Sequence, residues 1–111
     1  MDFAAKIMLF DSELGFFGPG VRDLFLNIDS EHSVKGASEK MGLSYSKAWK
    51  MIRNVEKALG EPAVTRTHGG TEGGSAQLTD AGRMLLGKYM RFEAKGKKAL
   101  QKVFEEEFRD E

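Results

Sequence analysis

Cysteine is absent from this 111-residue sequence, proline occurs only twice, and there is no long uninterrupted run of apolar residues. Without cysteine there is no disulfide framework, no thiolate metal site and no cysteine nucleophile, which fits a reducing cytoplasm. The N-terminal stretch MDFAAKIMLF contains an early acid and a lysine, so it predicts neither a secretory leader nor a membrane span. We expect one domain over residues 1–111, soluble and cytoplasmic, with no membrane partner.

Signatures of catalysis and of cofactor binding are also scarce. The two histidines, His32 and His68, are far apart and have no partner four residues away, which favours solvated turn histidines over a metal site. The segment HGGTEGG at 68–74 lacks the Gly-Lys-Ser/Thr ending of a nucleotide-binding loop. No Ser/His/Asp set or carboxylate pair stands out among the 17 acidic residues. We therefore expect no enzyme, no cofactor and no metal.

The formal net charge is zero, but the charges are distributed unevenly along the chain. Residues 33–98 carry 13 Lys/Arg against 6 Asp/Glu, a net charge of +7, whereas residues 1–32 carry −4 and residues 99–111 carry −3. Such segregation can create a positive face on a neutral protein, and a local positive face attracts phosphate. The middle of the chain is therefore the expected place for a nucleic acid.

Apolar spacing and capping residues predict a hairpin followed by two helices in the first part of the chain. Residues 4–17 contain two short apolar strands around a turn. The segment GPG at 18–20 ends this hairpin, and a helix with an apolar stripe is expected over 21–28. Ser33 is a suitable N-cap for a short helix over 34–41, which Gly42 would end in the left-handed conformation.

The next helix is predicted to have two chemically different faces. It should begin at Ser44 or Ser46 and end near Leu59, because Gly60 follows. At 100° per residue, one face is apolar and the opposite face is basic or hydroxylic. The apolar face contains Ala48, Ile52, Val55 and Leu59, and the other contains Ser46, Lys50, Arg53 and Lys57.

The last part of the chain predicts a second hairpin and a long helix. Strands over 63–67 and 75–79 are joined by the glycine-rich segment 68–74, and Thr79 with Asp80 then begins a helix to about residue 108. Such a helix is roughly 40 Å long, more than so small a domain needs for its own core, so its surplus apolar face is expected to meet a partner. The spaced apolar residues on this helix are Leu85, Tyr89, Phe92, Ala99 and Val103.

This order of elements is that of a winged helix-turn-helix, a mainly α (α+β) fold with an N-terminal β-hairpin, a glycine-rich wing hairpin and a long C-terminal helix. In that arrangement the basic helix enters the major groove of DNA, and the wing lies along the neighbouring backbone. Small hydroxyl residues at the helix start leave backbone N–H groups and the positive end of the helix dipole close to phosphate.

Four motifs resemble those of ModE-type molybdate-responsive regulators, which are related to LysR-type winged helix-turn-helix proteins. They are Gly42, SYSKAW at 44–49, GG..GG at 69–74 and LT..G at 78–82, and the similarity extends over roughly residues 4–92. The resemblance implies a homodimeric, sequence-specific transcription factor that reads an inverted repeat in double-stranded DNA and dimerises through the long helix. Its implied DNA contacts are Ser44, Tyr45, Ser46, Lys47, Lys50, Arg53, Arg66, Gly69, Gly70, Gly73 and Gly74. The dimer contacts are the five apolar residues of the last helix.

Two features depart from that family pattern. Full-length ModE regulators sense molybdate through a separate C-terminal domain, and this sequence ends without one, so a DNA-binding domain alone is expected, with room for a separate sensor or partner protein. Glu72 lies at the wing tip, where a basic residue would suit phosphate better. Two alternatives stay open: a winged helix used to bind another protein, and an oxyanion-responsive regulator with a pocket at the dimer seam.

Two aromatic residues of the basic helix also allow two interpretations each. Tyr45 can contact DNA from the helix start or pack its ring on the preceding helix. Trp49 lies between the two faces, which favours core packing with the indole N–H near the surface over contact with a base.

Overall fold

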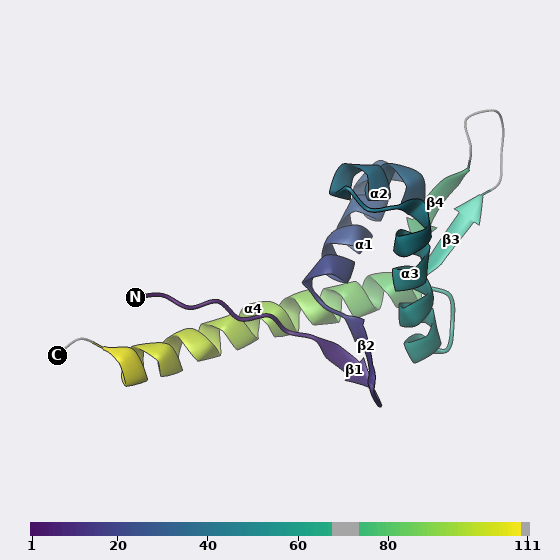
Figure 1. The fold of residues 1–111 in the computed structure, drawn as a ribbon. Helices are drawn as coiled ribbons and strands as arrows, with labels where there is room; N and C mark the ends of the chain where they lie inside the picture. Colours follow the sequence, from purple (N-terminus) through teal and green to yellow (C-terminus); the bar gives the residue numbers. More distant parts are fainter. Residues whose placement is uncertain (68–73, 110–111) are drawn as a thin grey trace.

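The computed structural model describes residues 1–67 and 74–109 of the chain. Two short hairpins and four helices follow one another in the predicted order (Figure 1). The elements are β1 (Leu9–Asp11), β2 (Leu14–Phe17), α1 (Pro19–Glu31), α2 (Val34–Met41), α3 (Tyr45–Leu59), β3 (Val64–Thr67), β4 (Ser75–Leu78) and α4 (Asp80–Phe108). Both hairpins are antiparallel, and β3 pairs with β4 in a regular register from Val64 opposite Leu78 to Thr67 opposite Ser75. The predicted winged helix-turn-helix architecture is confirmed.

The ends of the helices follow the capping residues of the sequence. Ser44, rather than Ser46, caps α3, and its hydroxyl accepts a hydrogen bond from the Lys47 N–H at 3.1 Å. Gly42 and Gly60 end α2 and α3 with φ angles of 70° and 76°, the left-handed conformation that a residue with a Cβ avoids. The three-residue interval between α2 and α3 therefore has a fixed geometry, which sets how α2 supports α3.

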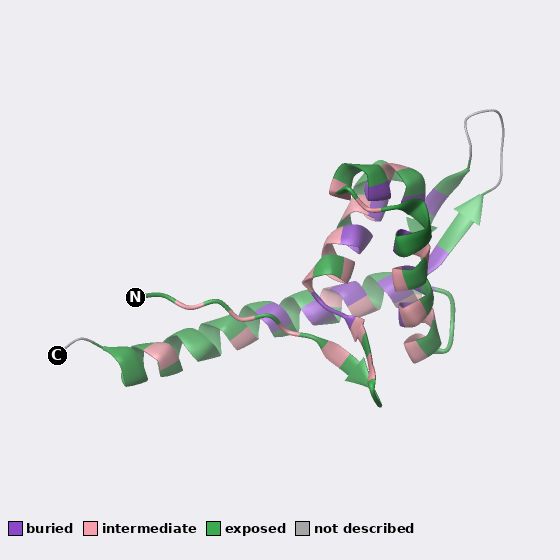
Figure 2. Cartoon of the chain, viewed as in Figure 1, coloured by how far each residue is buried: buried purple, intermediate pink, exposed green. Residues whose placement is uncertain are grey.

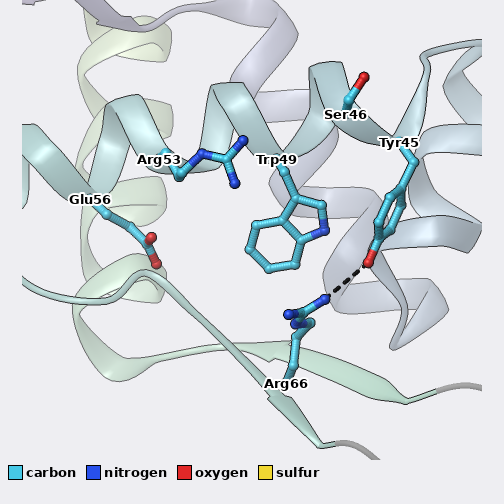
Figure 3. A pocket seen from close by; sticks show the side chains of 6 residues that line it. All are labelled: Tyr45, Ser46, Trp49, Arg53, Glu56 and Arg66. Atoms are coloured by element: carbon cyan, nitrogen blue, oxygen red, sulfur yellow. Dashed lines mark hydrogen bonds between the residues drawn. The ribbon is translucent and has the colours of Figure 1, made fainter.

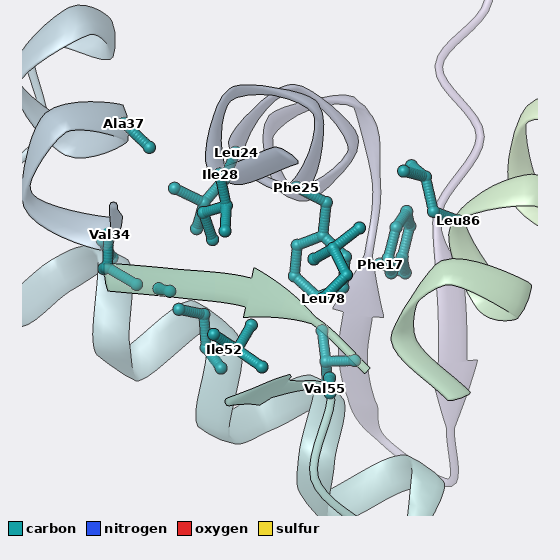
Figure 4. Packing of buried hydrophobic residues seen from close by; sticks show 14 of the residues in the cluster. Phe17, Leu24, Phe25, Ile28, Val34, Ala37, Ile52, Val55, Leu78 and Leu86 are labelled. Atoms are coloured by element: carbon teal, nitrogen blue, oxygen red, sulfur yellow. The ribbon is translucent and has the colours of Figure 1, made fainter. Parts of the chain in front are cut away.

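Apolar side chains from both hairpins and all four helices form a shared core (Figures 2 and 4). Leu24, Phe25 and Ile28 of the predicted α1 stripe are fully buried. Phe17 of β2 packs edge-to-face on Phe25, with ring centroids 5.4 Å apart. Complete burial of side chains of this size contributes about 1.5–3 kcal/mol each, so the core gives the helix-turn-helix a rigid base.

Helix α4 begins at a close contact with the loop that follows α3. Thr79 caps α4 by accepting a hydrogen bond from the Gly82 N–H at 3.0 Å, and its hydroxyl donates to the Pro62 carbonyl at 2.8 Å. The Ala63 carbonyl accepts from the Thr79 N–H at 2.9 Å and lies so near Gly82 that a Cβ there would be 2.3 Å from the oxygen. The LT..G motif therefore marks the junction between the hairpin and α4.

Ion pairs and a buried tyrosine join α4 to the rest of the fold. Arg22 of α1 pairs with Glu93, which is only 8% exposed, and also with its neighbour Asp23. Hydrogen bonds to Asp23 and Glu93 raise the pKa of Arg22, so it stays charged. Burial raises the pKa of Tyr89, whose hydroxyl donates to the Ile7 carbonyl at 2.8 Å. These contacts fix the direction of α4 relative to the helix-turn-helix.

The C-terminal half of α4 extends away from the core, and the N-terminal residues run beside it (Figure 1). The ring of Phe3 packs at a tilt against the ring of Phe104, with ring centroids 4.9 Å apart, and the Ile7 side chain approaches Gly96. The hairpin predicted over 4–17 is correspondingly shorter, because paired residues begin at Leu9. Among the described residues, no helix is long and apolar enough to span a membrane.

Candidate nucleic-acid interface

Helix α3 separates an apolar back from a polar front, as its sequence predicted. Ala48, Ile52 and Val55 are fully buried, while Leu59 is half-buried at the end of the helix. The predicted contact residues of α3 are all exposed: Ser44, Tyr45, Ser46, Lys47, Lys50 and Arg53. The back holds α3 against the core, so the front is available to a ligand.

The front of α3 is electrostatically suited to an anion. Within the described part of the chain, the side chains of Lys47, Lys50, Arg53 and Arg66 form no ion pair. The N-terminus of α3 adds backbone N–H groups and the positive end of the helix dipole on the same side. Unpaired cations next to a helix N-terminus provide the electrostatic contacts that a nucleic-acid backbone requires.

Arg66 joins this surface from strand β3, although 21 residues separate it from Tyr45 (Figure 3). Its Nη1 donates a hydrogen bond of 3.1 Å to the Tyr45 hydroxyl, and its guanidinium carbon lies 4.7 Å from the centre of the Trp49 ring. Tyr45 and Trp49 meet edge-to-face at 6.3 Å. We call these three residues the Tyr-Trp-Arg cluster. It lines one side of an open pocket of about 520 Å³ between α3 and β3.

The cluster also shows how the two aromatic residues lie relative to each other. Tyr45 packs on Trp49, one turn further along the same helix, and it remains 46% exposed. Trp49 is half-buried, and its indole nitrogen is buried without a hydrogen-bond partner among the described residues. In Figure 3 the nitrogen-bearing edge of the indole faces the Tyr45 ring. The expected packing of Trp49 against the core is confirmed, whereas the expectation that its indole N–H lies near the surface is wrong.

Glu56 has a structural role that sequence reasoning missed. Its Oε2 accepts hydrogen bonds from the backbone N–H groups of Ala63, at 2.9 Å, and Val64, at 3.5 Å. This carboxylate therefore ties the beginning of β3 to the last turns of α3 and keeps Arg66 beside Trp49. Acidic residues near a helix end are common, and no signal in the sequence distinguishes this one.

The sequence of residues 23–83 matches the family described as "Bacterial regulatory helix-turn-helix protein, lysR family". The match covers most of α1, all of α2, α3 and the wing hairpin, and the start of α4. The chain belongs to the lysR family. The description of this family is that of regulatory proteins.

Two curated relatives confirm the resemblance to ModE-type regulators. The chain is 35% identical over 104 residues to the molybdenum transport protein ModE of Azotobacter vinelandii, covering 93% of this chain and 38% of that protein. It is 40% identical over 62 residues to the molybdenum-pterin-binding protein MopB of Rhodobacter capsulatus, covering 56% of this chain and 23% of that protein. The chain thus spans less than two fifths of the length of these relatives.

Solved structures give the same lysR-type fold. The crystal structure of the CbnR DBD–DNA complex superposes with a TM-score of 0.58 at 18% identity, covering 76% of this chain and 91% of that chain. The full-length LTTR LysG of Corynebacterium glutamicum, with the effector Arg bound, superposes with a TM-score of 0.56 at 28% identity, covering 81% of this chain and 30% of that chain.

Some predicted positions of this lysR-family chain cannot be placed on the surface. Gly69, Gly70, Gly73 and Glu72 lie outside the described residues, whereas Gly74 is exposed and directly precedes β4. His68 also lies outside them. No group of three or more potential metal ligands occurs in the part of the chain that is described.

Proposed function

We propose that this chain is the DNA-binding domain of a transcriptional regulator that reads an inverted repeat as a homodimer. The front of α3 carries the proposal, since its exposed cations form no ion pair in the described chain and sit at the start of a helix braced from behind. Membership of the lysR family supports the same function. The DNA-bound structure of the CbnR domain shares the fold.

In this proposal the N-terminal half of α3 enters the major groove. Lys50 and Arg53, one and two turns into the helix, reach base edges or the adjoining phosphates, and arginine can donate two hydrogen bonds to guanine. Ser44 and Ser46 lie beside the backbone N–H groups at the helix start, where a phosphate binds favourably. The wing hairpin then follows the neighbouring backbone.

Two copies of the chain would pair through the exposed side of α4. Leu85, Phe92, Ala99 and Val103 share one face of this helix, and Phe92 and Val103 are 55% and 51% exposed. Tyr89 was predicted for the same face, but it is only 1% exposed and packs on Phe17 within the single chain. We therefore exclude Tyr89 from the proposed seam, because the core of its own chain already covers it.

The charges of α4 favour an antiparallel pairing of the two helices. Its middle is rich in Lys and Arg, whereas residues 105–107 are three consecutive glutamates. If two copies crossed near the small, exposed residue Ala99, the glutamates of each helix would lie opposite the basic stretch of the other. Such complementary charges select the pairing direction more than they add affinity.

Replacing Phe92 with glutamate is expected to convert the dimer into a monomer. The substitution places a charge at the centre of the proposed apolar seam, where it would lose its hydration without gaining a partner. Sedimentation equilibrium over a range of protein concentrations measures the change. Met84→Glu is the matched control, because Met84 is 60% exposed but lies on a different face of α4. A Phe92→Glu protein that dimerises like the unmodified chain would refute this interface.

A DNA titration at several salt concentrations tests the proposed function. With a labelled duplex of mixed sequence, the logarithm of the binding constant should fall linearly with the logarithm of the salt concentration. The slope should be about −0.9 for each phosphate neutralised. Fluorescence anisotropy of the duplex gives the affinity at each concentration. Folded protein that leaves the anisotropy unchanged even at low salt would contradict the proposal.

A further inference from the structure

The hydrogen bond between Arg66 and Tyr45 fixes the direction of a second donor. A guanidinium group can only donate hydrogen bonds, so the Tyr45 oxygen accepts from Arg66 Nη1. The hydroxyl hydrogen of Tyr45 must then point away from Arg66. Tyr45 is 46% exposed, so this hydrogen is free to reach an acceptor on a ligand. Arg66 and Tyr45 thus form two adjacent donors.

Trp49 holds this pair of donors in place. The Arg66 guanidinium lies 4.7 Å from the centre of the indole ring, and the Tyr45 ring meets the same indole edge-to-face. Cation–π contacts of this kind contribute about 0.5–1 kcal/mol at exposed sites, enough to favour one orientation of a flexible side chain. A ligand that binds here meets donors that are already oriented, which lowers the entropy lost on binding.

The pocket in front of the cluster has a net positive lining. Ser46 and Arg53 of α3 line it together with the cluster, and Glu56 is its one acidic lining residue among those described. The Oε2 of Glu56 already accepts two backbone hydrogen bonds at the start of β3. Two arginines, a free tyrosine hydroxyl and a serine hydroxyl match the oxygen acceptors and negative charge of a phosphate group.

We propose that Arg66 and Tyr45 form a clamp for a single phosphate of the DNA backbone, with Trp49 as its support. This inference rests on the proposed function, and it assigns these residues to backbone positioning and not to base reading. The clamp lies where the wing strand meets α3. It would therefore set the register of α3 in the groove before any base is contacted.

A coupling experiment with chemically modified DNA tests the clamp. Single phosphates of a bound duplex are replaced in turn by neutral methylphosphonates, and affinities are measured for the unmodified chain and for Tyr45→Phe. We expect Tyr45→Phe to weaken binding about tenfold, as for a hydrogen bond to a charged group. At one position, the methylphosphonate should weaken the unmodified chain more than it weakens Tyr45→Phe, because only the Arg66 contact with that phosphate remains to be lost in the variant.

An arginine pair provides the matched control for charge. Arg66→Gln should weaken binding at least as much as Tyr45→Phe, because it removes the charged donor of the clamp. Arg109→Gln removes the same charge from an exposed position just after α4, away from α3, and should change affinity by less than about twofold. Equal effects of the two substitutions would show a general loss of charge and overturn the clamp.

The remaining outcomes separate the clamp from the proposed function. If Tyr45→Phe binds like the unmodified chain, or couples to a base substitution and to no phosphate, the clamp is refuted while DNA binding stands. If the unmodified chain binds no DNA, the proposed function fails. In that case the fluorescence emission of Trp49, the only tryptophan in the sequence, is measured while inorganic phosphate is added at constant ionic strength. A response lost in Tyr45→Phe supports a site for free phosphate, and no response refutes the clamp as well.

Discussion

Replacing both Lys50 and Arg53 with alanine is expected to weaken binding to a specific duplex by about 100-fold or more. Each contact to a base edge or phosphate is worth roughly 1–3 kcal/mol, and 1.4 kcal/mol corresponds to a factor of ten in affinity. The slope of the salt dependence should also decrease by about one for each phosphate contact that is lost. Anisotropy titrations of the double variant at three or four salt concentrations measure both quantities.

The double variant should remain folded, because both side chains are exposed and form no ion pair in the described chain. Alanine favours helix at both positions, so the free energy of unfolding should change by less than about 0.5 kcal/mol. Lys6→Ala with Arg109→Ala is the matched control, since it removes the same charge from exposed positions outside α3 and α4. If this control weakened binding as much as the α3 variant, general electrostatics would explain the affinity, and α3 would lose its assigned role.

Replacing Gly82 with alanine is expected to destabilise the protein by about 2–4 kcal/mol. A Cβ at this position would lie 2.3 Å from the Ala63 oxygen, far inside van der Waals contact. The backbone cannot easily move aside, because the same carbonyl accepts the Thr79 N–H at 2.9 Å. Alanine gains at most about 1 kcal/mol in helix propensity over glycine, so the clash dominates. Thermal unfolding followed by circular dichroism should show a Tm lower by roughly 10 °C or more.

Gly87 of the same helix provides the comparison that isolates the clash. Its added Cβ would meet only the Nη1 end of the Arg91 side chain, at 3.1 Å, which can rotate away. Gly87→Ala should therefore leave the Tm unchanged or raise it, with a gain of up to about 1 kcal/mol in the free energy of unfolding. A Gly82→Ala protein as stable as Gly87→Ala would mean that the junction between the hairpin and α4 tolerates a side chain, contrary to our account.

Local sequence patterns were enough to predict most of the fold. Helix starts at Ser33 and Thr79, and helix ends at Gly42 and Gly60, follow from residues whose capping chemistry acts within three or four positions. The two faces of α3 follow from a period of 3.6 residues. Such signals depend on neighbours along the chain, so they can be interpreted before any tertiary contact is known.

Contacts between distant residues could not be predicted in the same way. Arg66 was expected to contact DNA, but its position on Trp49 and its bond to Tyr45 depend on how β3 lies beside α3. Tyr89 has the spacing of an exposed seam residue, yet the N-terminal segment and Phe17 cover it. The apolar period of a helix identifies its faces, but only tertiary packing decides which face its own chain covers.

Selection of bound duplexes from a random library, followed by sequencing, tests the central claim most directly. A dimer that presents two α3 helices should enrich an inverted repeat, with half-sites about one helical turn or a simple multiple of it apart. The Lys50→Ala, Arg53→Ala variant should lose this enrichment under the same conditions. If the protein is folded and dimeric but enriches no sequence, α3 does not read DNA bases, and the proposed function is wrong.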